Sequence, residues 1–76
     1  MKDIMWNAIM LREFQSLTCL SEEETLVLHD WAHGKSVVQT SMNHHMSERK
    51  VKDLRQTLRR KYDDVQIYTP LLPARK

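Results

Sequence analysis

Three serine residues divide most of the chain into helices. Ser21 is followed three residues later by Glu24, and Ser36 by Gln39, which is the spacing of a capping box at the start of a helix. Ser47 is a third N-cap, placed before a long stretch without glycine or proline. The expected helices cover about residues 22–33, about two turns after residue 36, and about residues 48–62.

The positions of glycine and proline and the pattern of apolar residues also favour helices over strands. The single glycine, Gly34, stands just past the expected end of the helix at 22–33, where a residue able to take a positive φ is favoured. Both prolines lie beyond residue 69, and no segment alternates apolar and polar side chains. We therefore predict one all-α domain over residues 1–76, with a helix-turn-helix core at 20–62 and an extended tail at 63–76.

The first segment, residues 3–16, is predicted to form an additional N-terminal helix with Asp3 as its N-cap. Its apolar side chains surround most of the circumference, so this helix needs cover on more than one side. Either a second copy of the helix in a homodimer or a central position within one chain would supply that cover. The residues expected at the dimer contact are Ile4, Trp6, Ile9, Met10 and Phe14.

Charge is distributed unevenly along the chain. Residues 1–34 carry two basic and six acidic side chains, a net charge of −4, whereas residues 35–76 carry ten basic and four acidic ones, a net charge of +6. In the long helix the apolar face consists of Val51, Leu54, Leu58 and Tyr62. The opposite face consists of Arg49, Lys52, Asp53, Gln56 and Arg60. A basic cluster of this kind indicates a polyanionic partner.

Several short motifs between residues 20 and 62 follow a known pattern. Leu20 and Ser21 precede an acidic first turn, Gly34, Lys35 and Ser36 separate the first two helices, and Ser47, Glu48, Arg49 and Val51 open the third. This pattern resembles the DNA-binding domain of LuxR-type response regulators and the related sigma-factor region that reads the −35 promoter element. The family usually carries an apolar residue, a small residue and a leucine in the short helix, where this chain has Thr40, Ser41 and His44. We therefore expect the short helix to pack through more polar contacts than in a typical member.

The resemblance implies double-stranded DNA as the partner. By that analogy the residues facing bases in the major groove are Arg49, Lys50, Lys52, Asp53 and Gln56. Those facing the DNA backbone are Lys35, Ser36, Ser47 and Arg55, and Arg59 lies farther along the helix, where phosphates are nearer. The expected function is a sequence-specific transcription regulator. The alternative is a sigma-like interaction module that binds RNA polymerase or another regulator without reading DNA, an alternative that the polar short helix favours.

Other chemistry has little support in the sequence. There is no glycine-rich phosphate loop and no pair of carboxylates with catalytic spacing, so we expect a protein that is not an enzyme and has no cofactor. His29 and His33 have a spacing that can hold zinc, with Cys19, His44 and His45 as further donors, but exposed helical histidines are the commoner explanation. We expect no metal site, and we read Trp6 and Trp31 as core residues.

The cysteine content and hydropathy bear on the cellular setting. The single cysteine, Cys19, cannot form an internal disulfide, and because it lies beside the apolar Leu17 and Leu20 it is expected to be a small buried residue rather than a nucleophile. No apolar run reaches the roughly 18 residues that a membrane span needs. These features predict a cytoplasmic protein with no contact with the membrane.

Overall fold

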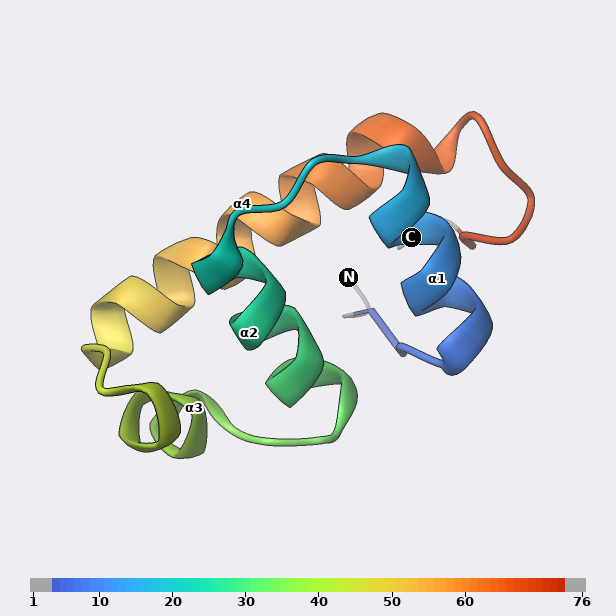
Figure 1. Ribbon diagram of the computed structural model, residues 1–76. Coiled ribbons are helices and arrows are strands. Elements are labelled where there is room, and N and C mark those ends of the chain that lie inside the picture. The colour runs from blue at the N-terminus through green and yellow to red at the C-terminus, as the bar shows by residue number, and fades with distance from the viewer. Residues whose placement is uncertain (1–3, 74–76) are drawn as a thin grey trace.

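The fold is an assembly of four helices in a computed structural model that describes residues 4–73 (Figure 1). The helices are α1 (Ala8–Leu17), α2 (Glu22–Ala32), α3 (Val37–His44) and α4 (Glu48–Gln66). No strand occurs in these residues, so the prediction of an all-α fold is confirmed. The longest helix, α4, runs along the molecule, with α3 beside its N-terminal end and α1 beside its C-terminal end.

The predicted serine caps are all present. Ser21 Oγ accepts a hydrogen bond of 3.1 Å from the Glu24 backbone, while the Ser21 backbone donates to the Glu24 carboxylate at 2.9 Å. Ser36 and Gln39 repeat this exchange at 3.1 and 2.9 Å, and Ser47 Oγ accepts from the backbone of α4 at 3.1 Å. These bonds satisfy N–H groups that a helix start leaves unpaired. They explain why α2, α3 and α4 begin where the sequence predicts.

The turn between α3 and α4 is short and held by backbone bonds. His45 has a φ of 55°, a left-handed conformation that few residues other than glycine adopt. The backbone N–H groups of His45 and Met46 both donate to the carbonyl of Ser41. The direction in which α4 leaves α3 is therefore set by local hydrogen bonds.

The start of α1 differs from the prediction. Asn7 is the N-cap, and its side-chain oxygen accepts from the Met10 backbone at 2.9 Å. Residues 4–7 are not helical, so the prediction of a helix from residue 3 is wrong over this segment, and Asp3 lies outside the described residues. Trp6 therefore lies in a non-helical segment, and its side chain packs against rings of α1, α2 and α4.

Trp6 is the centre of an aromatic cluster. Its ring centroid lies 5.3 Å from that of Phe14 in α1, 5.8 Å from that of Trp31 in α2 and 5.6 Å from that of Tyr62 in α4. Tilted and edge-on pairs at these distances contribute about 0.5–1.5 kcal/mol each beyond the burial of area. Trp31 is buried and Trp6 half-buried, so one side chain from a non-helical segment joins three helices.

The C-terminal segment folds back onto the core. α4 continues to Gln66, beyond its predicted end, and the residues after it are not an extended tail. Leu72 is only 1% exposed and belongs to the hydrophobic core. The hydroxyl of Tyr62, itself on the buried face of α4, donates to the carbonyl of Pro73. The prediction of an extended tail is therefore wrong for residues 63–73, because the apolar side chain of Leu72 has a place in the core.

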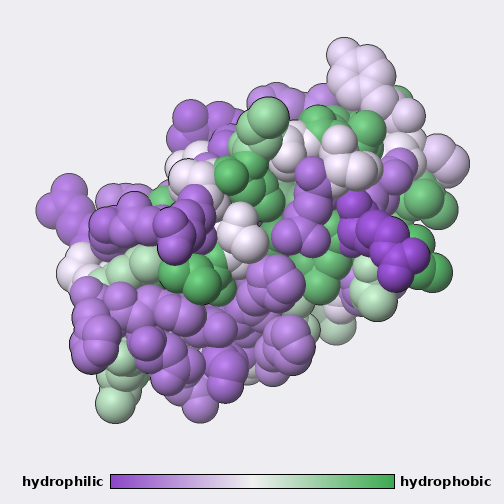
Figure 2. Space-filling view, viewed as in Figure 1, coloured by the Kyte–Doolittle hydropathy of each residue, from purple (hydrophilic) through white to green (hydrophobic). Residues whose placement is uncertain are grey.

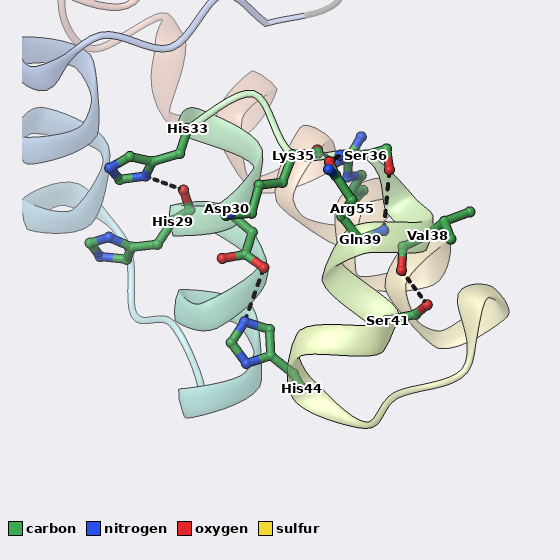
Figure 3. Close-up of polar contacts among 10 residues, drawn as sticks. All are labelled: His29, Asp30, His33, Lys35, Ser36, Val38, Gln39, Ser41, His44 and Arg55. Atoms are coloured by element: carbon green, nitrogen blue, oxygen red, sulfur yellow. Dashed lines mark hydrogen bonds and ion pairs between the residues drawn. The ribbon is translucent and has the colours of Figure 1, made fainter.

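Packing of α3 is polar, as its sequence predicts. Thr40 and Ser41 are buried, and Ser41 Oγ donates to the carbonyl of Val38 at 2.7 Å. The ring of His44 reaches α2, where its Nε2 lies 3.1 Å from Asp30 Oδ2 (Figure 3). The Thr40 hydroxyl is buried and has no hydrogen-bond partner within residues 4–73.

Replacing Thr40 by valine should raise the free energy of unfolding by about 1 kcal/mol, because it removes a buried hydroxyl that makes no hydrogen bond and keeps the shape of the side chain. Urea unfolding followed by tryptophan fluorescence measures the change. The matched control is Thr57→Val, since Thr57 Oγ1 donates to the Asp53 carbonyl at 3.1 Å and this substitution should give no gain. A loss of stability in Thr40→Val would show that the hydroxyl does have a partner.

Candidate nucleic-acid interface

One face of α4 is polar and open to solvent along its first four turns. We call this face the exposed α4 face, and it consists of Arg49, Lys52, Asp53, Gln56 and Arg60, all of which are exposed. The opposite side is the buried stripe of Val51, Leu58 and Tyr62, with exposed fractions of 1% or less. Within residues 4–73, no hydrogen bond or ion pair involves the side chains of Arg49, Lys52 or Arg60. Three cations are thus available to an external partner.

Two other lysines of α4 pair with the first turn of α2. Lys50 forms an ion pair with Glu23, in which both side chains are about half exposed. Lys61 Nζ lies 3.0 and 2.9 Å from the two carboxylate oxygens of Glu24, and it also donates to the Cys19 carbonyl at 3.0 Å. Lys50, which was expected to face bases, therefore lies on the flank of α4 that meets α2.

Glu24 in α2 is a buried acidic group whose pKa is shifted by its surroundings. Burial raises its pKa, but the Ser21 backbone donor, the Lys61 ammonium and the Ser21 hydroxyl oppose this effect. Together they hold the pKa of Glu24 below its ordinary value of 4.5. The ionised carboxylate is the form that joins α2 to α4, because it accepts from both helices at once.

Arg55 and Arg59 lie on the other flank of α4. Their guanidinium carbons are 5.0 and 4.9 Å from the centroid of the Trp31 ring, so both cations stack on one aromatic side chain of α2. Arg55 Nη2 also donates to the Lys35 carbonyl at 2.7 Å, in the connection between α2 and α3 (Figure 3). Both arginines, predicted to contact the DNA backbone, hold α4 against α2, a contact that the sequence analysis missed.

The remaining predicted backbone contacts are at helix starts. Lys35 and Ser36 are exposed just before α3, and Ser47 is exposed just before α4. The hydroxyls of Ser36 and Ser47 accept from backbone N–H groups, and each keeps its own proton for a further acceptor. The structure thus joins Lys35 to Arg55 and keeps Arg49, Lys52, Asp53 and Gln56 together, while Lys50 and Arg59 lie on opposite flanks.

The histidine and cysteine side chains named as possible zinc ligands do not come together at one site. The rings of His29 and His33 are stacked with centroids 6.5 Å apart, and His33 Nδ1 lies 2.7 Å from the His29 carbonyl oxygen. His44 contacts Asp30 instead, and residues 4–73 contain no cluster of three or more potential metal ligands. Cys19 is exposed, so its predicted burial is wrong, because its neighbour Leu20 is the side chain that packs on the core.

The residues expected at a dimer contact are mostly internal. Ile4, Met10 and Phe14 have exposed fractions of 6%, 5% and 0%, and Trp6 occupies the centre of the aromatic cluster. Ile9 differs from them, with 64% of its surface exposed. Of the two arrangements that could cover the N-terminal helix, burial within one chain accounts for four of its five named residues.

Two apolar side chains on α3 are exposed and were not predicted from the sequence. Val38 and Met42 are 48% and 71% exposed, and their i, i+4 spacing is the signal that could have revealed them. Elsewhere on this end of the molecule hydrophilic side chains predominate (Figure 2).

Of the helices in residues 4–73, none combines the length and apolar character that crossing a membrane requires. Comparison with protein-family models, curated proteins and solved structures gives no match for this chain.

Proposed function

We propose that this chain is a small sequence-specific DNA-binding protein that regulates transcription by placing the exposed α4 face in a major groove. The observation that carries the proposal is the cluster of Arg49, Lys52 and Arg60 on a helix whose other side is buried. A major groove admits one α-helix, and the N-terminal part of α4 projects at the end of the molecule beside α3. The resemblance of residues 20–62 to LuxR-type and sigma-factor domains supports the same orientation.

Each side chain of the exposed α4 face suits a different contact. An arginine can donate two hydrogen bonds to guanine, a glutamine can bond adenine through two atoms, and an aspartate can accept from cytosine. Arg49, Gln56 and Asp53 would take these roles. Lys52 would face the bases beside them, and Arg60 would meet a phosphate. Lys35 and Ser36, at the start of α3, would hold a further phosphate through charge and helix-terminal N–H groups. Arg55 would act indirectly, because it bonds the Lys35 carbonyl and fixes that turn.

Arg49→Ala should weaken binding to a selected DNA site by about 1–3 kcal/mol and relax the preference at one base pair. Arg60→Ala, more than two turns farther along α4, should weaken binding to all sequences alike and reduce the slope of log K against log salt by about one. Fluorescence anisotropy with the selected site and with a random duplex, each at two salt concentrations, measures both effects.

The control for this comparison is Gln15→Ala, an exposed change on α1 far from the exposed α4 face. It should leave DNA binding unchanged. Small and equal losses for Arg49→Ala, Arg60→Ala and the control would remove the DNA-reading role from α4. Circular dichroism of each variant establishes that it is folded.

A second candidate function rests on Val38 and Met42. Their exposed apolar side chains lie on α3 beside the exposed α4 face, and apolar contact is typical of protein partners rather than DNA phosphates. The chain would then bind RNA polymerase or another regulator. Binding of purified RNA polymerase that is lost in Val38→Ser/Met42→Ser, together with no affinity of the parent chain for duplex DNA, would favour this function.

A further inference from the structure

We propose that a second copy of this chain docks on α1 through an antiparallel contact about a two-fold axis. The surface, called the α1 face, consists of Ile9, Arg12, Glu13, Ser16 and Leu71. The proposal does not depend on DNA binding, and it differs from a dimer through the buried residues of the N-terminal segment.

The α1 face is a shallow apolar groove with charged residues at its centre. Its residues line a cavity of about 380 Å³, with Ile9 64% exposed and Leu71 49% exposed at its apolar edges. Ile67 and Tyr68, at the end of α4, are also more than 70% exposed. Figure 2 shows hydrophobic side chains gathered toward this end of the molecule, opposite the hydrophilic end formed around α3. Exposed apolar residues in one place, with a charged centre, indicate an interaction site.

The order of residues on this helix makes the face complementary to itself. Ile9, Arg12, Glu13 and Ser16 follow the spacing i, i+3, i+4, i+7 and therefore share one side of α1. A two-fold axis between positions 12 and 13 places Arg12 opposite Glu13 of the second copy, and the reverse pair forms as well. The same axis places the bulky Ile9 opposite the small Ser16 of the second copy. Two ion pairs thus flank the axis, and one contact between Ile9 and Ser16 lies at each end.

Arg12 and Glu13 form no ion pair within the part of the chain that the structure describes. Adjacent residues on a helix point about 100° apart, so Arg12 and Glu13 of one chain do not face each other. Within residues 4–73 neither side chain takes part in a hydrogen bond or an ion pair. The charge complementarity is therefore available to another copy of α1, and this is why we assign the face to a second copy rather than to a different partner.

The contact is small, so the association should be weak. α1 has ten residues and is about 15 Å long, and the interface lies well below the size of a stable dimer. We expect a dissociation constant on the order of 10–100 µM. Because α1 lies beside the C-terminal end of α4, two copies joined here leave the N-terminal part of each α4 open.

Charge reversal tests this arrangement directly. Arg12→Glu and Glu13→Arg each place like charges opposite one another twice across the axis, and each should weaken self-association at least about tenfold. An equimolar mixture of these two variants should associate as a heterodimer, because every charge then meets its opposite. The double variant Arg12→Glu/Glu13→Arg should also regain association. Sedimentation velocity at concentrations up to about 500 µM, above the expected dissociation constant, measures all four samples.

Glu48→Arg is the matched control, since it reverses one exposed charge at the first residue of α4, whereas α1 lies beside the C-terminal end of that helix; it should leave self-association unchanged. Because the assay contains no DNA, its outcome is separate from that of the DNA-binding experiment. A monomeric parent chain over the whole concentration range would overturn the proposal. Failure of the mixture to associate, or association of either single variant as strong as that of the parent chain, would overturn it equally. Thermal unfolding followed by circular dichroism verifies that each variant is folded.

Discussion

Replacing Phe14 by alanine should lower the free energy of unfolding by about 3–5 kcal/mol, the range found for large aromatic side chains removed from a core. Phe14 is 0% exposed, and its ring lies 5.3 Å from that of Trp6 and 6.1 Å from that of Tyr62. A domain of this size is stabilised by only about 4–11 kcal/mol in total. The substitution should therefore remove a large fraction of the total stability, which a urea titration measures as a lower midpoint concentration.

The matched control for Phe14→Ala is Ile9→Ala on the same helix. Ile9 is 64% exposed, so its truncation should change the free energy of unfolding by less than about 0.5 kcal/mol. Both proteins are compared at about 1 µM, well below the concentration at which a weak dimer would form. Equal losses for the two variants would contradict the placement of Phe14 in the core of a single chain.

Lys61→Met should lower the free energy of unfolding by about 2–3 kcal/mol near neutral pH, because it leaves the buried Glu24 carboxylate without its cation. The neighbouring pair of Lys50 and Glu23 is the control. Both of its side chains are about half exposed, so Lys50→Met should cost less than about 1 kcal/mol. Both free energies come from urea unfolding at the same ionic strength.

The effect of Lys61→Met should also depend on pH. The folded-state pKa of Glu24 is below 4.5, so the stability that its ionised form contributes is present above that pH and is lost as the pH falls through the folded pKa. The difference in the free energy of unfolding between the parent chain and Lys61→Met should therefore shrink on acidification below about pH 4.5. A difference that stays constant down to pH 3 would show that Lys61 acts through packing instead of charge.

Helix starts could be predicted from the sequence because the groups that fix them are local. Ser21, Ser36 and Ser47 each bond a backbone group three residues away, so the caps need no tertiary contact. The predicted start of α1 was wrong because Asn7, not Asp3, is the N-cap, and the segment before it contributes Trp6 to the aromatic cluster, a tertiary contact that no local motif indicates. The prediction of an extended tail was wrong for a similar reason, since burial of Leu72 depends on a core that several helices form together.

The same distinction applies to the candidate interface. The exposed α4 face follows from helical periodicity, which the sequence contains, and its five residues are exposed as predicted. Lys50, Arg55 and Arg59 belong to the flanks of α4, and their contacts depend on where α2 crosses it. Periodicity separates a buried side from an open one but does not identify which neighbouring helix covers each edge. Side chains at those edges are consequently the ones whose roles need the structure.

The position of Trp6 has a consequence for the order in which the chain folds. The helices α2, α3 and α4 follow one another through short connections, so their mutual contacts close small loops and form at low entropic cost. Trp6 and Leu72 come from opposite ends of the sequence and join the core beside α4. The contact between Trp6 and Tyr62 joins distant parts of the sequence and closes a long loop, so we expect it to form after α2, α3 and α4 have packed together. The aromatic cluster is then expected to be complete only once those three helices are in place.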